Sequence, residues 1–140
     1  MRLRTKIAGL LRFRVGKPKS IWVRGEDAAT KHMKKKGYQI LARNLRLKMG
    51  EIDILCLDPK TNSVVVVEVK ARTRKSAATL APEASITAAK KRKLRTLAKG
   101  IAARDDCRGK RIRIDVVAVE FAIDQADPIA LRHYESAVGA

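Results

Sequence analysis

Two acidic residues adjoin apolar runs of strand length, a setting in which charge is unusual. Asp53 comes just before the apolar run 55–57, and Glu68 directly follows the valines at 64–67. Residues 58–62 are turn formers, so the pattern predicts two strands joined as a hairpin. An ionised carboxylate in a buried strand is costly unless it is paired or bound to a metal. The two acids are therefore the first candidates for chemistry.

The hairpin register predicts which side chains meet. A turn centred between Lys60 and Thr61 places Asp53 opposite Glu68. The same register places Glu51 opposite Lys70. Side chains alternate between the two faces of a strand, and directly opposed Cβ atoms lie roughly 5 Å apart. The prediction is a cluster of three carboxylates and one ammonium on one face.

Such a cluster suits a divalent cation, because two opposed carboxylates repel each other as ions. Mg²⁺ takes oxygen ligands and is typically held by one or two carboxylates plus substrate phosphate, with Mn²⁺ as the alternative ion. A nearby lysine can stabilise a phosphate or an attacking hydroxide. The competing interpretation is a solvated salt bridge between Glu51 and Lys70. That interpretation leaves two like charges, Asp53 and Glu68, opposed without a reason.

Several short motifs also carry a family resemblance. Asp53 followed by Glu68-Val69-Lys70 resembles the signature of the PD-(D/E)XK nuclease superfamily. Over residues 22–121 the chain resembles the YraN-like uncharacterised bacterial family, which is similar to archaeal Holliday junction resolvases. The motifs that carry this resemblance are Gly25-Glu26, Gly37-Tyr38, Arg43-Asn44, Gly50-Glu51-Ile52-Asp53, Val67-Glu68-Val69-Lys70 and Asp115-Val116-Val117.

The resemblance implies an α/β, restriction-endonuclease-like fold with a central mixed sheet flanked by helices. It also implies Mg²⁺-dependent hydrolysis of DNA phosphodiester bonds, with branched DNA as one expected substrate and a homodimer as one expected assembly. The implied catalytic residues are Asp53, Glu68, Lys70 and Glu26. The implied metal ligands are Asp53, Glu68, Glu26 and the Val69 backbone carbonyl.

Two helices should flank the hairpin. The first is predicted over residues 20–36, with Ser20 as its N-cap and Gly37 as its stop, and the second from Thr87 to about Ala103. Glu26 shares the inner row of the first helix and should point inward or toward a cleft. Pairing of Glu26 with Arg24 or Thr30 near the surface is the alternative. The inner row of the first helix is marked by Trp22, Ala29 and Met33.

The second helix has its own core stripe, formed by Leu94, Leu97, Ala98 and Ile101. Lys90 lies four residues before Leu94 on the inner row, and the resemblance implies a position near the site. Basic side chains near the acids are candidates to bind nucleic-acid phosphates or are simply solvated surface. The candidates for nucleic-acid binding are Arg43, Arg46, Lys48, Arg72, Arg74, Lys90 and Lys91.

The remaining elements are predicted from short patterns. A first strand is expected over 38–42, followed by a basic loop, and a loop is expected over 72–82. A turn over 105–109 should contain Cys107 in a polar setting. A last strand over 111–121 carries Asp115, which is interpreted as structural, paired with Arg113 or Lys110. The two histidines, His32 and His133, are predicted to be surface residues.

The composition limits the class of protein. A chain of 140 residues suits one domain, here 20–121. Residues 1–19 are expected to form a basic arm that is either disordered or amphipathic. Residues 122–140 are expected to form an extension that packs on the domain or trails from it. A net charge of +18 favours polyanions, with DNA as the expected partner, RNA as the alternative and a membrane surface as the competitor. No apolar run approaches the ~20 residues that span a bilayer, so we expect a soluble chain. Two unpaired-looking cysteines are typical of the reducing cytoplasm.

Two other functions compete with a nuclease. One is a non-catalytic nucleic-acid-binding module of the same fold, and the other is a ribosome-associated basic protein. The net charge fits all three functions equally. The Asp53 and Glu68 pair separates them, because a protein that only binds phosphate has no use for converging carboxylates.

Overall fold

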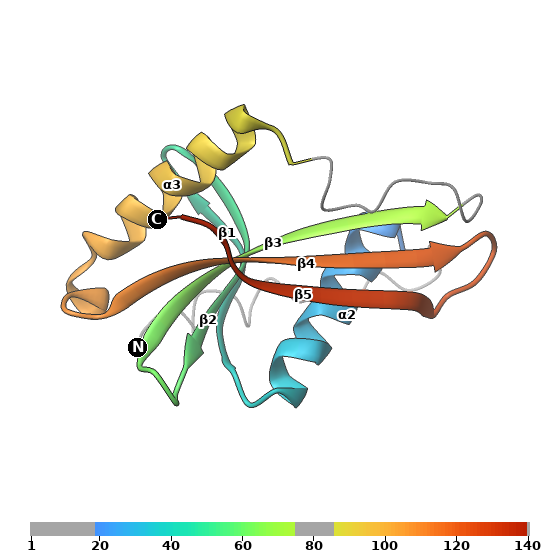
Figure 1. The fold of residues 1–140 in the computed structure, drawn as a ribbon, viewed down its shortest axis with the longest axis horizontal. Coiled ribbons are helices and arrows are strands. Elements are labelled where there is room, and N and C mark those ends of the chain that lie inside the picture. The colour runs from blue at the N-terminus through green and yellow to red at the C-terminus, as the bar shows by residue number, and fades with distance from the viewer. Residues whose placement is uncertain (1–18, 75–85, 140) are drawn as a thin grey trace.

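The computed structural model describes residues 19–74 and 86–139 as one mixed sheet with a long helix on each face (Figure 1). The predicted α/β class, a central mixed sheet flanked by helices, is confirmed. The predicted order of helix, three strands, helix and strand is also confirmed. The elements are α2 (Ile21–Lys35), β1 (Gln39–Leu47), β2 (Gly50–Asp58), β3 (Ser63–Arg74), α3 (Ala88–Ala102), the short 3₁₀ helix η3 (Asp105–Cys107), β4 (Arg111–Ala122) and β5 (Pro128–Val138).

The five strands lie in chain order across the sheet, from β1 to β5. Neighbouring strands are antiparallel except for β3 and β4, which are parallel over their whole length. A parallel pair needs a crossover connection, and α3 lies in the connection between these two strands. The first helix therefore packs on one face of the sheet and the crossover helix on the other.

Both long helices begin at the predicted N-caps. The Ser20 hydroxyl accepts a hydrogen bond from the Val23 backbone N–H at 3.3 Å, and the Thr87 hydroxyl accepts one from the Lys90 backbone N–H at 3.1 Å. The first helix ends before Gly37, which has a φ of 92° that favours glycine. No helix among residues 19–74 and 86–139 is long and apolar enough to cross a membrane.

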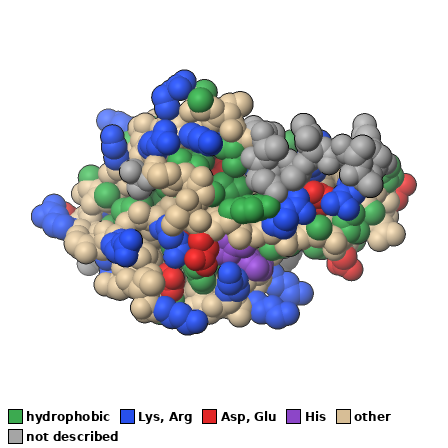
Figure 2. All heavy atoms as spheres, viewed as in Figure 1, with side chains coloured by type: hydrophobic (Ala, Val, Ile, Leu, Met, Phe, Trp, Pro, Cys, Tyr) green, Lys and Arg blue, Asp and Glu red, His purple; other side chains and the backbone are tan. Residues whose placement is uncertain are grey.

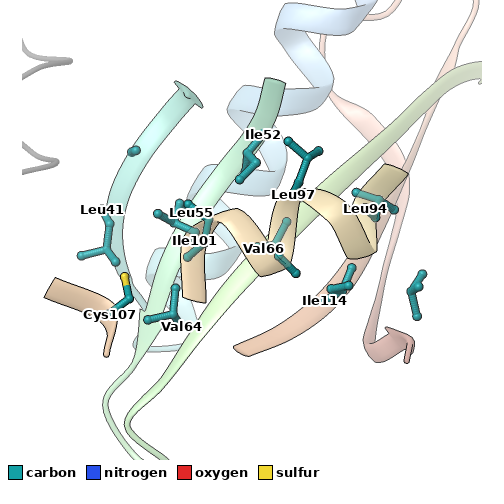
Figure 3. Packing of buried hydrophobic residues seen from close by; sticks show 13 residues of the cluster. Leu41, Ile52, Leu55, Val64, Val66, Leu94, Leu97, Ile101, Cys107 and Ile114 are labelled. Carbon is teal, nitrogen blue, oxygen red and sulfur yellow. The ribbon is translucent and has the colours of Figure 1, made fainter. Parts of the chain in front are cut away.

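Apolar side chains fill both sides of the sheet. On one side, the predicted stripe of α3 packs onto the hairpin strands and β4, as Figure 3 shows for Leu94, Leu97 and Ile101. On the other side, Ala29 and Met33 of α2 pack in a second cluster that includes valines of β3 and β4. Alternate residues of β3 thus enter opposite clusters, since Val66 belongs to the first and Val67 to the second.

Three local predictions need correction. Strand β1 runs on to Leu47 because it pairs with β2, so Arg43 and Arg46 lie in a strand and not in a basic loop. Strand β3 continues to Arg74 because it pairs with β4, so residues 72–74 are not a loop. Cys107 is buried in the cluster beneath α3 and is not in a polar setting, because η3 turns its side chain into the core.

The two ends of the chain differ in what the structure describes. Residues 128–138, within the predicted extension, form strand β5 and pair antiparallel with β4 at the edge of the sheet. The basic arm predicted for 1–19 lies outside the described residues up to residue 18. The predicted loop likewise lies outside them from residue 75 onward.

Substitution of Gly25 by alanine tests how tightly α2 packs on β3. A Cβ at Gly25 would lie 2.5 Å from the Ala71 Cβ, a distance that forces the helix or the strand to shift. Alanine normally stabilises a helix interior by about 1 kcal/mol relative to glycine, whereas overpacking costs typically ~1–3 kcal/mol. We therefore expect Gly25→Ala to lower the free energy of unfolding in urea titrations.

Gly139→Ala is the matched control, because no heavy atom lies within 4 Å of its added Cβ. The control should unfold at the urea concentration of the unmodified chain. A Gly25→Ala variant as stable as this control would contradict the close packing of α2 on β3.

Candidate active site

Asp53 and Glu68 meet where β2 and β3 part. The antiparallel ladder between these strands runs from Asp58 opposite Ser63 to Ile54 opposite Val67, the register predicted from the turn. Beyond Ile54 the Asp53 carboxylate accepts a hydrogen bond from the Val69 backbone N–H at 2.9 Å. The same carboxyl group is hydrogen-bonded to Glu68. The two carboxyl groups are thus held together at the end of the ladder.

The predicted pairing of Glu51 with Lys70 is wrong. Glu51 pairs with Arg46 of β1, whose guanidinium lies 3.9 Å from its carboxylate. Lys70 pairs with Ala118 of β4. The physical reason is that β2 and β3 diverge after Ile54, where a side-chain carboxylate and not a backbone carbonyl receives the Val69 N–H.

Burial and charge repulsion strain this pair electrostatically. Burial, followed by the neighbouring negative charge of Glu68, raises the pKa of Asp53 to about 7, although the hydrogen bond from Val69 acts in the opposite direction. Glu68 is itself only 5% exposed. Near neutral pH the pair therefore sits between one and two negative charges, a state that a cation would stabilise.

Lys90 supplies a positive charge to this pair from the opposite side of the site. Its ammonium lies 3.2 Å from Glu68 Oε2. The Thr87 cap fixes the first turn of α3, and this turn carries Lys90 over the sheet beside Glu68. The structure thus brings Lys90 to the acids, as its inner-row position suggested, while its role with nucleic acid stays a prediction.

Glu26 approaches the site from α2. Burial raises its pKa, against the influence of Asn44 and Arg43. With the Asn44 amide oriented so that its nitrogen faces the acids, it donates to Glu26 Oε2 at 3.1 Å and to Glu51 Oε1 at 3.3 Å. The negative charge of Glu26 also acts on Asp53. Glu26 is therefore linked through Asn44 to Glu51 of β2, and its charge reaches Asp53.

Asn44 was not among the predicted site residues. It has a positive φ of 51°, a conformation that asparagine tolerates better than most residues. Its place in the Arg43-Asn44 motif was the one signal available in the sequence. The alternative partners of Glu26 do not hold its carboxylate: Thr30 donates to the Glu26 backbone carbonyl, and Arg24 donates to the Gln125 carbonyl.

Lys70 is available to a ligand. It alternates along β3 with Val69 and Ala71, which pack toward α2, so its side chain leaves the strand on the same face as Glu68. Within the part of the chain that the structure describes, the Lys70 ammonium has no carboxylate partner. Lys70, which the sequence analysis assigned to phosphate stabilisation, is thus not paired with a carboxylate of residues 19–74 or 86–139.

The other basic candidates fall into two groups. Arg43 donates to Asp27 at 2.9 Å, and Arg74 forms an ion pair with buried Glu120, so both have internal partners. Arg46, Lys48 and Lys91 are exposed, and Arg72 is half-buried in β3. Lysine and arginine side chains are spread over the visible face of the molecule, and acidic ones are fewer (Figure 2). Binding of nucleic acid by these residues stays a prediction.

The donor set fits a hard divalent cation. Among the described residues, no three His, Cys, Asp or Glu side chains are arranged to hold a metal ion by themselves. This excludes from residues 19–74 and 86–139 a preformed structural zinc site, which needs four protein ligands. Two carboxylates with the neighbouring backbone match Mg²⁺, which keeps waters and takes substrate phosphate as a ligand. The raised pKa of Asp53 marks the unbalanced negative charge that such an ion would offset.

The histidines form a second polar cluster on the α2 side of the sheet. The His133 side chain is only 3% exposed, so its predicted surface position is wrong. Strand β5 places His133 opposite Val117 in the sheet. His133 Nε2 lies 2.8 Å from Asp115 Oδ2, and its Nδ1 lies 3.2 Å from His32 Nε2. Histidine is visible as the purple patch in Figure 2.

Asp115 has a structural role at the centre of that cluster. The predicted partner Arg113 donates to it at 2.8 Å, and the Ser136 backbone N–H donates at 3.0 Å. Burial would raise the pKa of Asp115, but hydrogen bonds from His133 and Arg113 outweigh burial and hold the pKa below its usual value. Asp115 therefore remains a carboxylate that ties β4 to β5.

Comparisons with known proteins point to one family. A family profile described as "Uncharacterised protein family UPF0102" matches residues 25–119. A "UPF0102 protein" from Mycobacterium sp. (strain KMS) is 39% identical over 117 residues, which cover 79% of this chain and 84% of the relative. Another from Caldicellulosiruptor saccharolyticus is 41% identical over 95 residues, which cover 68% of this chain and 77% of the relative.

Two solved structures show a distant likeness. The "crystal structure of a repair endonuclease from Pyrococcus abyssi" gives a TM-score of 0.45 with 12% identity over 81% of this chain. The "Structure of EndoMS-dsDNA2 complex" gives a TM-score of 0.41 with 12% identity over 82% of this chain. The match covers 43% of each of those chains, less than half of their length.

The pKa of Asp53 predicts how stability depends on pH. The folded-state pKa of about 7 lies above the ordinary value of 3.8, so the folded chain keeps a proton that the unfolded chain loses. The stability that Asp53 contributes to the fold is therefore present at low pH and is lost as the pH rises through 7. Asn at position 53 keeps an acceptor for the Val69 N–H without the charge. We expect Asp53→Asn to gain stability relative to the unmodified chain as pH rises from 5 to 8 in metal-free urea titrations.

Asp27→Asn should behave in the opposite way. Burial raises the pKa of Asp27, but hydrogen bonds from Lys19 and Arg43 outweigh burial and lower it, so this carboxylate stabilises the fold at neutral pH. Its replacement should reduce stability throughout the range from pH 5 to 8. If Asp53→Asn instead lost a constant amount of stability at every pH, the strained carboxylate pair would be refuted.

Proposed function

This chain belongs to the uncharacterised protein family UPF0102, and we propose that it is a metal-dependent endonuclease that hydrolyses phosphodiester bonds in DNA. One observation carries the proposal: the half-buried Asp53 and the buried Glu68 are held together at the open end of a strand pair, with Lys90 beside Glu68. A core built for stability alone has no use for this repulsion, because apolar residues of similar size would pack there without it.

The residues have distinct tasks in this proposal. Asp53 and Glu68 hold Mg²⁺, or Mn²⁺ as the alternative, and the Val69 carbonyl adds an oxygen ligand. Glu26 adds a third carboxylate or orients a water molecule. When bound, the ion offsets the charge of the scissile phosphate and makes water easier to deprotonate. The Val69 N–H fixes the Asp53 carboxylate, so little reorganisation is needed when substrate arrives.

The two lysines act at different points. Lys70 has no carboxylate partner among the described residues, and its ammonium stabilises the negative charge that develops on the phosphate during hydrolysis. Lys90 neutralises Glu68 in the ligand-free chain. When the Glu68 carboxylate is engaged by substrate and cation, the Lys90 ammonium becomes available to a neighbouring phosphate.

DNA is the proposed substrate because of the charge of the chain. A net charge of +18 gives attraction to phosphate backbones that weakens as salt rises and carries no sequence preference. Arg46, Lys48 and Lys91 are exposed contributors. The resemblance adds branched DNA as the preferred form and a homodimer as the assembly, and RNA is the alternative partner.

A non-catalytic nucleic-acid-binding module remains the second candidate. It is favoured by the lack of a preformed three-ligand metal group among residues 19–74 and 86–139. The two candidates share the charge and the fold, and they differ in whether a cation engages Asp53 and Glu68.

Cation binding should be visible as a gain in stability at pH 8. A ligand at 100 times its dissociation constant stabilises a folded chain by about 2.7 kcal/mol. We expect saturating Mg²⁺ or Mn²⁺ to raise the thermal unfolding midpoint of the unmodified chain and to have little effect on Asp53→Asn. Asp105→Asn, on the exposed η3 turn, is the control and should respond like the unmodified chain. Equal responses of both variants would mean that the cation binds elsewhere.

Cleavage of labelled linear, flapped and four-way-branched DNA tests the activity itself. We expect metal-dependent cutting that Glu68→Gln and Lys70→Ala each reduce by roughly 100-fold or more, because each removes a group that acts on the transition state. DNA affinity should change only a few-fold in both variants. Lys99→Ala, an exposed lysine of α3, controls for the loss of one positive charge and should cut normally. Tight, salt-sensitive binding without cutting on every substrate would favour the binding module.

A further inference from the structure

Trp22 lies on the sheet-facing row of α2 but is not buried. The row continues through Gly25, Ala29 and Met33, which are all buried, and the spacing predicted that Trp22 would be buried as well. Its side chain is instead 65% exposed. The prediction is wrong because the start of α2 packs on the second cluster through Ile21 and Gly25, which leaves the Trp22 side chain outside the packed surface.

The exposed indole ring lies one helical turn from Glu26, a residue of the proposed active site. Trp22 and Glu26 are four residues apart on one helix, so their side chains lie on one face with Cβ atoms about 6 Å apart. The negative charge of Glu26 acts on Asp53, and Glu26 shares Asn44 with Glu51. The ring is thus one turn of helix from a carboxylate whose charge reaches the site.

The end of the helix that carries the ring is held in place. Gly25 packs so closely on Ala71 that an added Cβ would lie 2.5 Å from the Ala71 Cβ. On the side of α2 away from the site, Arg24 donates to the Gln125 carbonyl at 2.8 Å and stacks 4.8 Å from the centre of the Phe121 ring. The indole is therefore presented from a fixed backbone, which lowers the entropy lost on binding.

The chemistry of the exposed group identifies what it contacts. Trp22 is the only exposed aromatic ring in residues 19–74 and 86–139, and it lies in a chain of net charge +18. The other large exposed apolar side chains, Val23, Met49, Ile123 and Ile129, are aliphatic or a thioether and lack a π-face. Positive charge combined with an exposed aromatic ring is the pattern that binds single-stranded nucleic acid, where unpaired bases stack on the ring.

We propose that Trp22 stacks on an unpaired base next to the phosphate held at Asp53 and Glu68, so that the preferred substrate is DNA with unstacked nucleotides at the cut. This inference rests on the proposed nuclease function and specifies its substrate class. Bases inside a duplex have both faces covered by neighbours, so only flaps, junction centres and single strands offer a free face to the indole. Trp22 is then a specificity residue and takes no part in the hydrolysis.

The single tryptophan provides a direct readout, because a base stacked on the indole quenches its fluorescence. The experiment titrates the full chain, in EDTA and at one fixed salt concentration, with an oligothymidylate and with a blunt duplex of equal length. We expect saturable quenching by the oligothymidylate and little quenching by the duplex. Fluorescence that changes with protein concentration in the absence of DNA would overturn the proposal and assign Trp22 to contact between chains.

Affinity measured by anisotropy of labelled DNA gives the matched comparison. Stacking by one base is worth about 1–3 kcal/mol, so Trp22→Ala should weaken binding of the oligothymidylate roughly 5- to 100-fold and alter duplex binding less than twofold. Trp22→Phe retains a π-face and should recover most of the affinity. Val23→Ala removes a neighbouring exposed apolar group from another side of the helix and should bind normally.

The outcomes separate this inference from the nuclease proposal. Quenching with preference for unpaired DNA but no cleavage under any metal would retain the stacking role and refute the nuclease. Cleavage without fluorescence quenching would retain the nuclease and refute the stacking role. The same conclusion would follow if Trp22→Ala cut flapped and duplex DNA at the same ratio of rates as the unmodified chain. Urea titration of each variant identifies any loss of folding, and Trp22→Phe decides the matter if Trp22→Ala is unstable.

Discussion

The hydrogen bond from the Val69 N–H to the Asp53 carboxylate is the interaction on which the site depends. A strand that accepts this bond through a side chain cannot continue the backbone ladder in register, so β2 and β3 separate after Ile54 and Val67. The separation opens the sheet without leaving the Val69 N–H unsatisfied, which would be costly in a buried strand. The same hydrogen bond therefore positions the Asp53 carboxylate and separates the two strands at the site.

Two helices then deliver charges to this opening from opposite faces of the sheet. The first helix brings Glu26, and the first turn of the crossover helix brings Lys90 to Glu68. Each helix is positioned by its own cap and its own apolar row. The site is thus assembled from four segments that are distant in sequence, and its geometry follows from the packing of both cores.

Local signals in the sequence were sufficient for the elements and for the approximate place of the acids. Turn residues at 58–62 set the hairpin register, and Ser20 and Thr87 set the starts of the helices. The parting of β2 from β3 could not be predicted, because a bond between a side chain and a backbone amide leaves no periodic pattern. The mistaken pairing of Glu51 with Lys70 followed from extending the ladder through that point.

Other errors arose where tertiary pairing overrides a local pattern. Helical spacing assigned Trp22 to the core, but the start of α2 packs on the sheet through Ile21 and leaves Trp22 exposed. His133 is polar and isolated in sequence, yet strand β5 buries it against Asp115. In each case the missing information was the tertiary surface against which the residue or its neighbour packs.

The parallel pairing of β3 with β4 has a consequence for how the chain folds. The second edge of β3 cannot be covered until α3 and β4 are in place, and such non-local pairing forms slowly. During that delay the run of four valines at 64–67 is an uncharged, β-prone edge of the kind that nucleates aggregates. Glu68 and Lys70, which follow it directly, interrupt the run with charge. The residues that form the candidate site therefore also protect the nascent chain, and their replacement by apolar side chains would lower the yield of folded protein.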